Sequence, residues 1–138
     1  DALAMAAANS EVRYTNTHEW AMPKGEEVLV GITDFAVKQL QDLVFIDLPK
    51  AGARIERGKR FGEVESVKAV SELIAPVGGT VVAANDALAA DLERPARDPF
   101  GAGWLIRVKP EGTSPAEAVA GLLDAAAYKK VCDEYHGH

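Results

Sequence analysis

The sequence predicts an α+β domain that is mainly β, with short strands in the middle of the chain forming a sandwich. Two observations support this class. Short apolar runs rich in β-branched residues are separated by Gly and Pro turns, which is typical of short strands. The helical signals are brief and lie between these runs or after Pro110. Because the 138 residues contain no solenoid repeat and no long linker, we expect one domain.

Four elements are expected in the first half of the chain. The run 28–32 is rich in β-branched residues, and Thr33 or Asp34 after it offers a helix N-cap. Pro49 cannot continue a strand ladder and therefore ends the second strand. We expect, in order, a strand over 28–32, a helix over 35–41, a strand over 43–48 and a loop over 51–59.

The second half is expected to hold more strands and short helices. The alternation of Trp104, Ile106 and Val108 predicts that these three side chains share the core face of a strand. Ser114 and Glu117 have the spacing of a capping box, which marks a helix start. We expect strands over 61–67, 69–75, 80–84 and 104–109, a short helix capped by Asn85 or Asp86 and ended by Pro95, a loop over 98–103, and terminal helices capped by Ser114 and Asp124.

The ends of the chain are set apart from the fold. The Ala-rich start carries no turn or cap signals, so we expect residues 1–11 to be a disordered stub or tag remnant, 12–135 to be the folded domain and 136–138 to be a tail. The two histidines of the tail are too few for a metal site. We expect His18 at the surface or at a strand edge, and Cys132 as a small packed residue.

The composition limits the classes of function. Apolar residues make up 48% of the chain and aromatic residues 7%, so the core must be built mostly from Val, Leu, Ile and Ala. The net charge of −6 disfavours nucleic-acid binding, which needs clustered Lys and Arg, and suits docking on basic patches of partner proteins. No stretch approaches the roughly 18 apolar residues of a membrane span. The single Cys132 excludes an intrachain disulfide and fits a reducing compartment.

Lys68 is the candidate for chemistry. Two strands of similar length enter and leave it, and each is bounded by Gly or Pro turns, so a hairpin would place Lys68 at its tip with the ammonium exposed. A modifying ligase needs such a projecting amine, because the amine must reach an activated acyl group. The small Ala69 leaves room for a docking enzyme. A lone exposed lysine is normally only a solvated charge, so the assignment depends on the blocks around it.

These blocks resemble the glycine cleavage system H proteins. Gly62–Ala69 and the later Ala75–Gly79 look like the lipoyl-attachment hairpin of that family. Further blocks follow in the same order as in the family, and together they cover roughly residues 12–132, which is far more specific than one lysine motif. These further blocks are Tyr14 with His18-Glu19-Trp20, Gly31-Ile32-Thr33-Asp34, Val44 to Pro49, and Asp98 to Ile106.

The resemblance implies a fold and a cofactor. H proteins adopt a lipoyl-domain-like β sandwich, the barrel-sandwich hybrid, with added short helices. They carry lipoate in amide linkage on the hairpin lysine, which corresponds to Lys68. A lipoate ligase or a lipoyl or octanoyl transferase attaches the group. The residues that match the motif for this recognition are Glu65, Ser66, Val67 and Ala69.

The resemblance also implies a non-catalytic carrier role with three partners. The P protein decarboxylates glycine and passes the aminomethyl group to the lipoyl disulfide, the T protein transfers the one-carbon unit to tetrahydrofolate, and the L protein reoxidises the arm. Tethering keeps the carried group at a high effective concentration. The loaded arm folds into a cleft, and the matching positions here are Thr17, Glu19 and Glu72. The two carboxylates are expected to hold the cationic nitrogen.

Several alternatives stay open. The closest rival is another lipoyl or biotinyl carrier domain. Biotin domains usually flank their lysine with methionines, whereas Val67 and Ala69 stand here. The lipoyl domains of 2-oxo acid dehydrogenases often place Asp before the lysine and lack the helices after Pro110. An H-like protein that serves lipoate transfer to other enzymes is a second alternative. An enzyme is disfavoured because no Ser-His-Asp set, metal-spaced cluster or phosphate loop occurs. The segment 127–134 resembles plant-type mitochondrial members, which implies the mitochondrial matrix, with the bacterial cytoplasm as the alternative.

Overall fold

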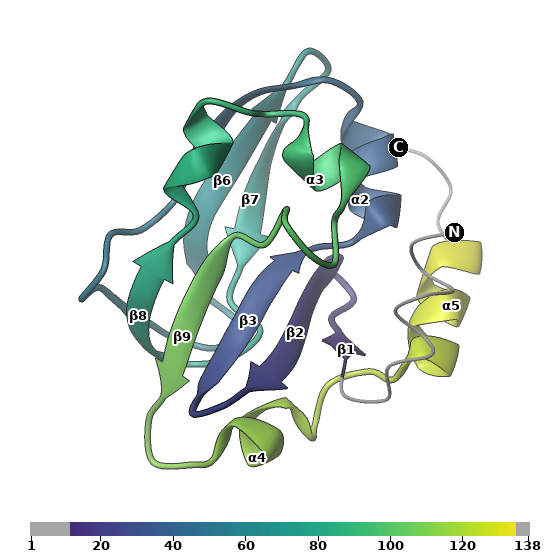
Figure 1. Cartoon of the computed structure of the whole chain (residues 1–138). Helices are drawn as coiled ribbons and strands as arrows, with labels where there is room; N and C mark the ends of the chain where they lie inside the picture. The colour runs from purple at the N-terminus through teal and green to yellow at the C-terminus, as the bar shows by residue number, and fades with distance from the viewer. Residues whose placement is uncertain (1–11, 135–138) are drawn as a thin grey trace.

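The computed structural model describes residues 12–134, which form two antiparallel sheets with short helices around them (Figure 1). One sheet has six strands in the order β1-β2-β3-β9-β8-β5, and the other has three in the order β4-β6-β7. The prediction of a mainly β fold with short helices is confirmed. The expected stub (1–11) and tail (136–138) lie outside the described residues.

The elements are all short. The strands are β1 (Arg13–Tyr14), β2 (Glu19–Lys24), β3 (Glu27–Ile32), β4 (Leu43–Asp47), β5 (Arg54–Ile55), β6 (Arg60–Ser66), β7 (Val70–Ile74), β8 (Gly79–Ala84) and β9 (Ile106–Pro110). The helices are α2 (Asp34–Leu40), the 3₁₀ helix η1 (Asp86–Ala89), α3 (Arg94–Arg97), α4 (Pro115–Val119) and α5 (Ala125–Asp133). Within residues 12–134, none of these helices is long and apolar enough to cross a membrane.

The main core lies between the two sheets. Val28 of β3, Val64 of β6 and Leu73 of β7 meet there, and each is at most 2% exposed. Removing such aliphatic side chains from water contributes about 25 cal/mol per Å² and is the main force that holds the sheets together. The core is thus aliphatic, as the composition predicted.

A second apolar cluster covers the opposite face of the six-stranded sheet. Ala21 of β2 belongs to the main core, whereas its neighbour Trp20 belongs to the second cluster, because successive side chains of a strand point to opposite faces. Tyr14 and Tyr128 complete this cluster and stack with ring centroids 4.7 Å apart. Through Tyr128, the terminal helix α5 is attached to the sheet (Figure 1). Cys132 is half-buried at the edge of the cluster, as expected of a small packed residue.

Three of the predicted helix caps are confirmed. The side chains of Thr33, Ser114 and Asp124 each accept a hydrogen bond from the backbone N–H three residues later, at 3.2, 3.2 and 2.8 Å. These bonds satisfy N–H groups that have no partner inside the helix. The sequence therefore predicted where α2, α4 and α5 begin.

Three expected boundaries are wrong. The expected loop 51–59 contains β5, which pairs with β8 at the sheet edge. Pro95 does not end the helix after Asn85, since η1 ends earlier and Pro95 lies in the first turn of α3, where a missing N–H costs nothing. The last strand begins at Ile106 and not at Trp104. Trp104 also does not share the core face with Ile106 and Val108 as expected, since it packs against the second cluster.

Candidate functional site

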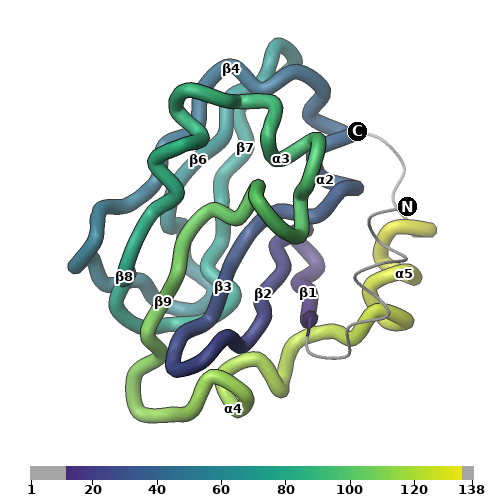
Figure 2. Tube along the Cα trace, in the orientation of Figure 1, coloured from purple at the N-terminus to yellow at the C-terminus, as the bar shows by residue number. Residues whose placement is uncertain are grey.

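The β6–β7 hairpin presents Lys68 at its tip. Glu65 and Val70 are the last cross-strand pair, and the backbone N–H of Ser66 donates to the carbonyl oxygen of Ala69 at 2.8 Å, which closes the turn. Lys68 is exposed, and the hairpin tip projects above the other strands in Figures 1 and 2. Lys68 therefore lies at an exposed hairpin tip, as the sequence predicted.

Ser66 fixes the backbone of this turn. Its Oγ accepts hydrogen bonds from the backbone N–H groups of Lys68 at 3.1 Å and Ala69 at 3.0 Å, and its hydroxyl donates to the Ala69 carbonyl oxygen at 3.2 Å. The N–H of Val67 donates to the carbonyl oxygen of Asp42 at 3.0 Å, which ties the tip to the segment before β4. The turn is thus held by the Ser66 hydroxyl and by backbone hydrogen bonds, while the side chains of Val67, Lys68 and Ala69 are exposed.

The outer face of the three-stranded sheet carries exposed apolar side chains beside the tip. Glu65 on β6 lies between its cross-strand neighbours Phe45 on β4 and Val70 on β7. Phe45 is 51% exposed and Val70 is 60% exposed, and Val67 at the tip is 64% exposed. Grouped apolar side chains on a surface commonly mark an interaction site. An enzyme that approaches the Lys68 amine therefore also meets this face.

Glu19, the first residue of β2, is buried with 1% of its surface exposed. Its Oε1 accepts hydrogen bonds from the hydroxyls of Thr15, at 2.7 Å, and Thr17, and its Oε2 accepts one from the backbone N–H of Ile74 at 3.1 Å. Burial raises the pKa of this carboxyl group, and the hydrogen bonds oppose the shift because they stabilise the ionised form. Glu19 thus connects the 15–19 turn to β7, the strand that leaves the lysine hairpin.

The three predicted cleft residues are only partly brought together. Thr17 and Glu19 are hydrogen-bonded to each other, whereas Glu72 lies exposed on β7, opposite Glu63 of β6. A depression of about 290 Å³ beside the turn is lined by Thr17 and Ile74, among others, and neither Glu19 nor Glu72 is part of its lining. Thr17 and Glu19 are therefore in contact with each other, whereas Glu72 is exposed to solvent on β7.

Sequence reasoning missed the residues that hold this turn in place. Thr15 and Ile74 were not singled out, although the Thr-x-Thr-x-Glu spacing of 15–19 brings two hydroxyls near one carboxylate. His18 was expected at the surface or a strand edge, but it is half-buried in the turn, and its Nδ1 lies 2.8 Å from the Tyr128 hydroxyl. No local pattern predicts that contact, because it joins residues 110 positions apart.

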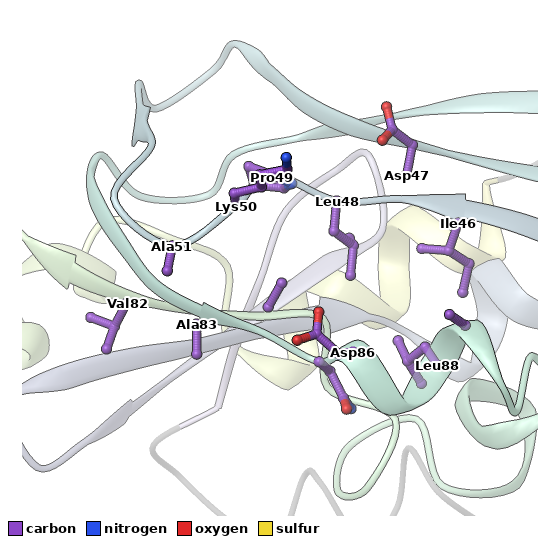
Figure 3. A pocket seen from close by; sticks show the side chains of 13 residues that line it. Ile46, Asp47, Leu48, Pro49, Lys50, Ala51, Val82, Ala83, Asp86 and Leu88 are labelled. Atoms are coloured by element: carbon purple, nitrogen blue, oxygen red, sulfur yellow. The ribbon is translucent and has the colours of Figure 1, made fainter.

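A second cavity lies at the end of β4 that is remote from the hairpin tip. It has a volume of about 490 Å³ and is bounded by the end of β4, β8 and η1. Figure 3 shows Ile46 and Leu48 pointing toward Leu88 of η1, whereas Asp47 points away from it. None of the predicted site residues lines this cavity. The candidate site is therefore the hairpin tip with the 15–19 turn behind its second strand.

The arrangement is suited to presenting an amine. An exposed lysine on a fixed turn can accept an acyl group and then carry it at the end of a long, mobile side chain. In the part of the chain that the structure describes, no group of three or more His, Cys, Asp or Glu residues is placed to hold a metal ion. Lys68 is therefore accessible to an enzyme that approaches the hairpin tip.

Comparison with known proteins places the chain in a family. The model of the glycine cleavage H-protein family matches residues 12–135. A glycine cleavage system H protein of Anaeromyxobacter sp. (strain K) is 48% identical over 124 residues, which are 90% of this chain and 94% of that protein. One of Synechococcus sp. (strain RCC307) is 50% identical over 119 residues, 86% of this chain and 89% of that protein.

The fold is shared as well. The crystal structure of a glycine cleavage system H protein from Mycobacterium marinum superposes with a TM-score of 0.78 at 42% identity, covering 88% of this chain and 95% of that one. This similarity confirms the predicted barrel-sandwich hybrid. The chain therefore belongs to the glycine cleavage H-protein family, the non-catalytic lipoyl carriers of the glycine cleavage system.

Proposed function

We propose that this chain carries lipoate in amide linkage on Lys68 and shuttles the aminomethyl group of glycine between the enzymes of the cleavage system. The observation that supports the residue assignment most strongly is the exposed Lys68 on a turn whose backbone Ser66 holds. Family membership supports the class of cofactor, because H proteins carry lipoyl-lysine. When bound, the lipoyl group supplies a redox-active disulfide on a flexible arm.

The residues at the tip fit such a group. The hydrogen bonds that fix the turn use the backbone of Lys68 and Ala69 and the side chain of Ser66, so the Lys68 amine is not needed to hold the fold. Amide formation at Nζ removes the positive charge of Lys68. Because the side chain is exposed, this change requires no rearrangement of buried groups.

Four neighbours of Lys68 support recognition by the attaching enzyme, a lipoate ligase or a lipoyl or octanoyl transferase. Ser66 sets the shape of the turn, and Ala69 leaves space beside the amine. Val67 offers an exposed apolar contact, and Glu65 offers a carboxylate within the exposed apolar face of the sheet. Each of these groups lies on the hairpin itself, so one enzyme can contact all of them.

The arm cleft is the second part of the proposal. Thr17, Glu19 and Glu72 would receive the cationic end of the loaded arm. The carboxylate of Glu19 accepts three hydrogen bonds, and an ionised carboxylate has about four acceptor positions, so one further donor can be accommodated. Glu72 is exposed and free to move toward a bound cation. A charge-assisted hydrogen bond of this kind contributes about 1.5–3 kcal/mol.

The cleft is tested by the rate at which the glycine-charged carrier loses ammonia without T protein. Removal of one carboxylate, in Glu19→Gln or Glu72→Gln, should speed this loss by one to two powers of ten, at about 1.4 kcal/mol per tenfold. Glu63→Gln is the matched control, because Glu63 lies directly opposite Glu72 on the adjacent strand. Equal rates in all four proteins would refute the carboxylate cleft and leave only the tether.

Membership of the glycine cleavage system implies three partners, the P, T and L proteins. The bacterial relatives described above favour the bacterial cytoplasm, whereas the resemblance of segment 127–134 to plant-type mitochondrial members favours the mitochondrial matrix. Microscopy of the full-length gene product in its own organism separates the two compartments.

The carrier function is tested by glycine–bicarbonate exchange with P protein. The lipoylated wild type should support exchange, and Lys68→Arg should abolish it, because the guanidinium stays protonated and cannot be acylated. Lys59→Arg is the matched control on the same hairpin and should retain exchange. The melting midpoint of Lys68→Arg should barely move, since surface substitutions usually change stability by less than about 0.5 kcal/mol. An active Lys68→Arg variant would overturn the assignment.

The alternative function is an H-like carrier that serves lipoate transfer to other enzymes. Such a protein would be lipoylated on Lys68 and would donate the group to another carrier, yet would fail in glycine–bicarbonate exchange. Exchange activity of the wild type therefore supports the glycine system. Lipoylation without exchange would favour the alternative.

A further inference from the structure

A closed ring of hydrogen bonds joins three separate segments. The backbone N–H of Thr33 donates to the carbonyl oxygen of His18 at 3.0 Å, and Thr33 Oγ1 lies 2.6 Å from the Tyr128 hydroxyl. The same hydroxyl lies 2.8 Å from Nδ1 of His18, which completes the ring. The ring therefore joins the 15–19 turn, the residue before α2, and the terminal helix α5.

The ring holds His18 in an uncommon backbone conformation. His18 has φ of 74°, in the left-handed region that residues other than glycine seldom adopt. Such conformations persist where the surroundings hold them in place, and they cluster at functional sites. Here Thr33 holds the carbonyl group of His18 and Tyr128 holds its side chain. The next residue along the chain is Glu19, whose carboxylate binds β7.

We propose that Tyr128 is a positioning residue: acting through His18, its hydroxyl fixes the 15–19 turn and so keeps the Glu19 carboxylate bound to β7. Through Tyr128, the C-terminal helix α5 thereby fixes the 15–19 turn next to β7, the second strand of the lysine hairpin. The link to the carried group rests on the proposed function of Lys68 and Glu19. The positioning itself is a property of the chain alone and is testable without the cofactor.

The hydroxyl protons give the ring a direction. Thr33 Oγ1 accepts a hydrogen bond from the N–H of Ala36, so its own proton is available to the Tyr128 oxygen. Tyr128 can then donate its proton to Nδ1 of His18, provided that this nitrogen is unprotonated. A protonated Nδ1 would instead donate to Tyr128, which would turn the Tyr128 proton toward Thr33. The buried Thr33 proton would then lose its acceptor in the ring.

The surroundings favour the neutral histidine that this direction requires. Burial lowers the pKa of His18. Asp34 acts electrostatically on both Tyr128 and Cys132 and thereby belongs to the same polar cluster. The ionisable groups around the ring include Tyr14 from β1, Glu19 from β2, Asp34 from α2, and Tyr128 and Cys132 from α5. Arg13 acts electrostatically on Tyr14, and Lys129 and Asp133 act on Cys132.

The two stacked tyrosines provide a matched pair of variants. Tyr14 and Tyr128 are both fully buried, with ring centroids 4.7 Å apart. The Tyr14 hydroxyl has no hydrogen-bond partner among residues 12–134, whereas the Tyr128 hydroxyl contacts His18 and Thr33 in the ring and also interacts with Cys132. Tyr128→Phe therefore removes the ring hydroxyl and Tyr14→Phe removes an unused one, with the same loss of volume.

The readout is hydrogen exchange of the Ile74 amide in the full-length protein without lipoate, because this N–H donates to Glu19. Tyr128→Phe should speed its exchange by about tenfold, which corresponds to about 1.4 kcal/mol of opening free energy. The amide of Val81, in the other sheet, should be unchanged and excludes a global loss of stability. Tyr14→Phe should exchange Ile74 at the wild-type rate. An unchanged rate in Tyr128→Phe, or equal acceleration in both variants, would overturn the proposal.

If Tyr128→Phe does not fold, the tautomer of the His18 ring in the wild type tests the proposal. The ¹⁵N shifts of the His18 ring report which nitrogen carries the proton. We expect the tautomer with the proton on Nε2 and an acceptor Nδ1 at neutral pH. A proton on Nδ1 would contradict the ring. Lipoylation of Lys68 should occur in the wild type and persist in Tyr128→Phe. Failure of attachment in the wild type would count against the proposed function and not against the ring.

Discussion

Within residues 12–134, Glu19 is the one buried residue whose side chain is a carboxyl group. A buried carboxylate is stable only when its oxygens are hydrogen-bonded, and here two threonine hydroxyls and one backbone N–H supply the donors. The backbone donor belongs to Ile74 of β7, so the side chain replaces a partner that this edge strand lacks at that position. Glu19 is therefore part of the fold as well as of the proposed cleft.

Glu19→Ala should destabilise the protein by about 2–4 kcal/mol, because it leaves the partly buried N–H of Ile74 without its acceptor and opens a cavity. Glu72→Ala, on the same strand as Ile74, is the control and should change stability by less than about 0.5 kcal/mol, since Glu72 is exposed. Urea unfolding of both variants measures the difference. Equal midpoints for the two would show that the hydrogen bonds of Glu19 do not support the fold.

The pH dependence of stability should carry a signature of His18. Burial lowers its pKa below the usual value of 6.5, so in the window between the two pKa values the unfolded chain binds more protons than the folded one. Stability is then fully present above about pH 6.5 and is lost as the pH falls through the lowered pKa. His18→Asn, which keeps a side chain that tolerates positive φ, should lose less stability between pH 7.5 and 5.5 than the wild type does. A parallel decline in both proteins would exclude His18 as the cause.

In the β6–β7 hairpin, one side-chain hydroxyl, that of Ser66, makes the side-chain hydrogen bonds that shape the tip. Ser66 accepts two backbone hydrogen bonds from the tip, and this type of side-chain contact favours turns over a continued ladder. The hairpin therefore presents Lys68 in a defined turn and not on a frayed loop. The turn does not rely on apolar packing, because its side chains are exposed.

Ser66→Ala should slow lipoylation of Lys68 more than it affects stability. Loss of the acceptor frees two exposed N–H groups, which water can satisfy, so the unfolding free energy should fall by no more than about 1 kcal/mol. The attaching enzyme would meet a disordered turn, and its kcat/KM for the protein should fall about tenfold if the turn is populated one time in ten. Ser71→Ala, on β7 beyond the tip, is the control. Unchanged lipoylation kinetics in Ser66→Ala would show that the turn is not recognised.

β4 and β6 approach each other so closely at Gly62 that a side chain there is expected to destabilise the sheet. A Cβ at Gly62 would lie 2.3 Å from the carbonyl oxygen of Asp47, and a backbone atom inside a sheet cannot move away at low cost. Gly62→Ala should therefore destabilise by about 1–3 kcal/mol. Gly121→Ala is the control, because its nearest neighbours are the atoms of the flexible Arg57 side chain at 3.5 Å. Thermal unfolding distinguishes the two, and an unaffected Gly62→Ala would contradict the tight strand pairing.

For the whole molecule, local patterns predicted the elements whose signals lie within a few residues. The β-branched run of β3, the caps at Thr33, Ser114 and Asp124, and the hairpin around Lys68 all follow from short-range chemistry. These features depend on steric preferences and hydrogen bonds inside one segment. They can therefore be predicted from the sequence without knowledge of the tertiary fold.

Features that depend on contacts between distant segments could not be predicted in this way. β2 was missed because it contains Pro23 and charged residues at both ends, and it is a strand because β1 and β3 pair with it. The burial of Glu19 depends on Ile74, 55 positions away, and the contact of His18 depends on Tyr128, 110 positions away. The partner residues become visible only once the fold brings them together.

Mass analysis of the protein after incubation with lipoate, ATP and a lipoate ligase shows whether Lys68 carries the lipoyl group. We expect one lipoyl unit per chain in the wild type and in Lys59→Arg, with peptide mapping assigning it to Lys68, and none in Lys68→Arg. Lipoyl found on another lysine of the wild type, or retained in Lys68→Arg, would contradict the assignment of the lipoyl group to Lys68.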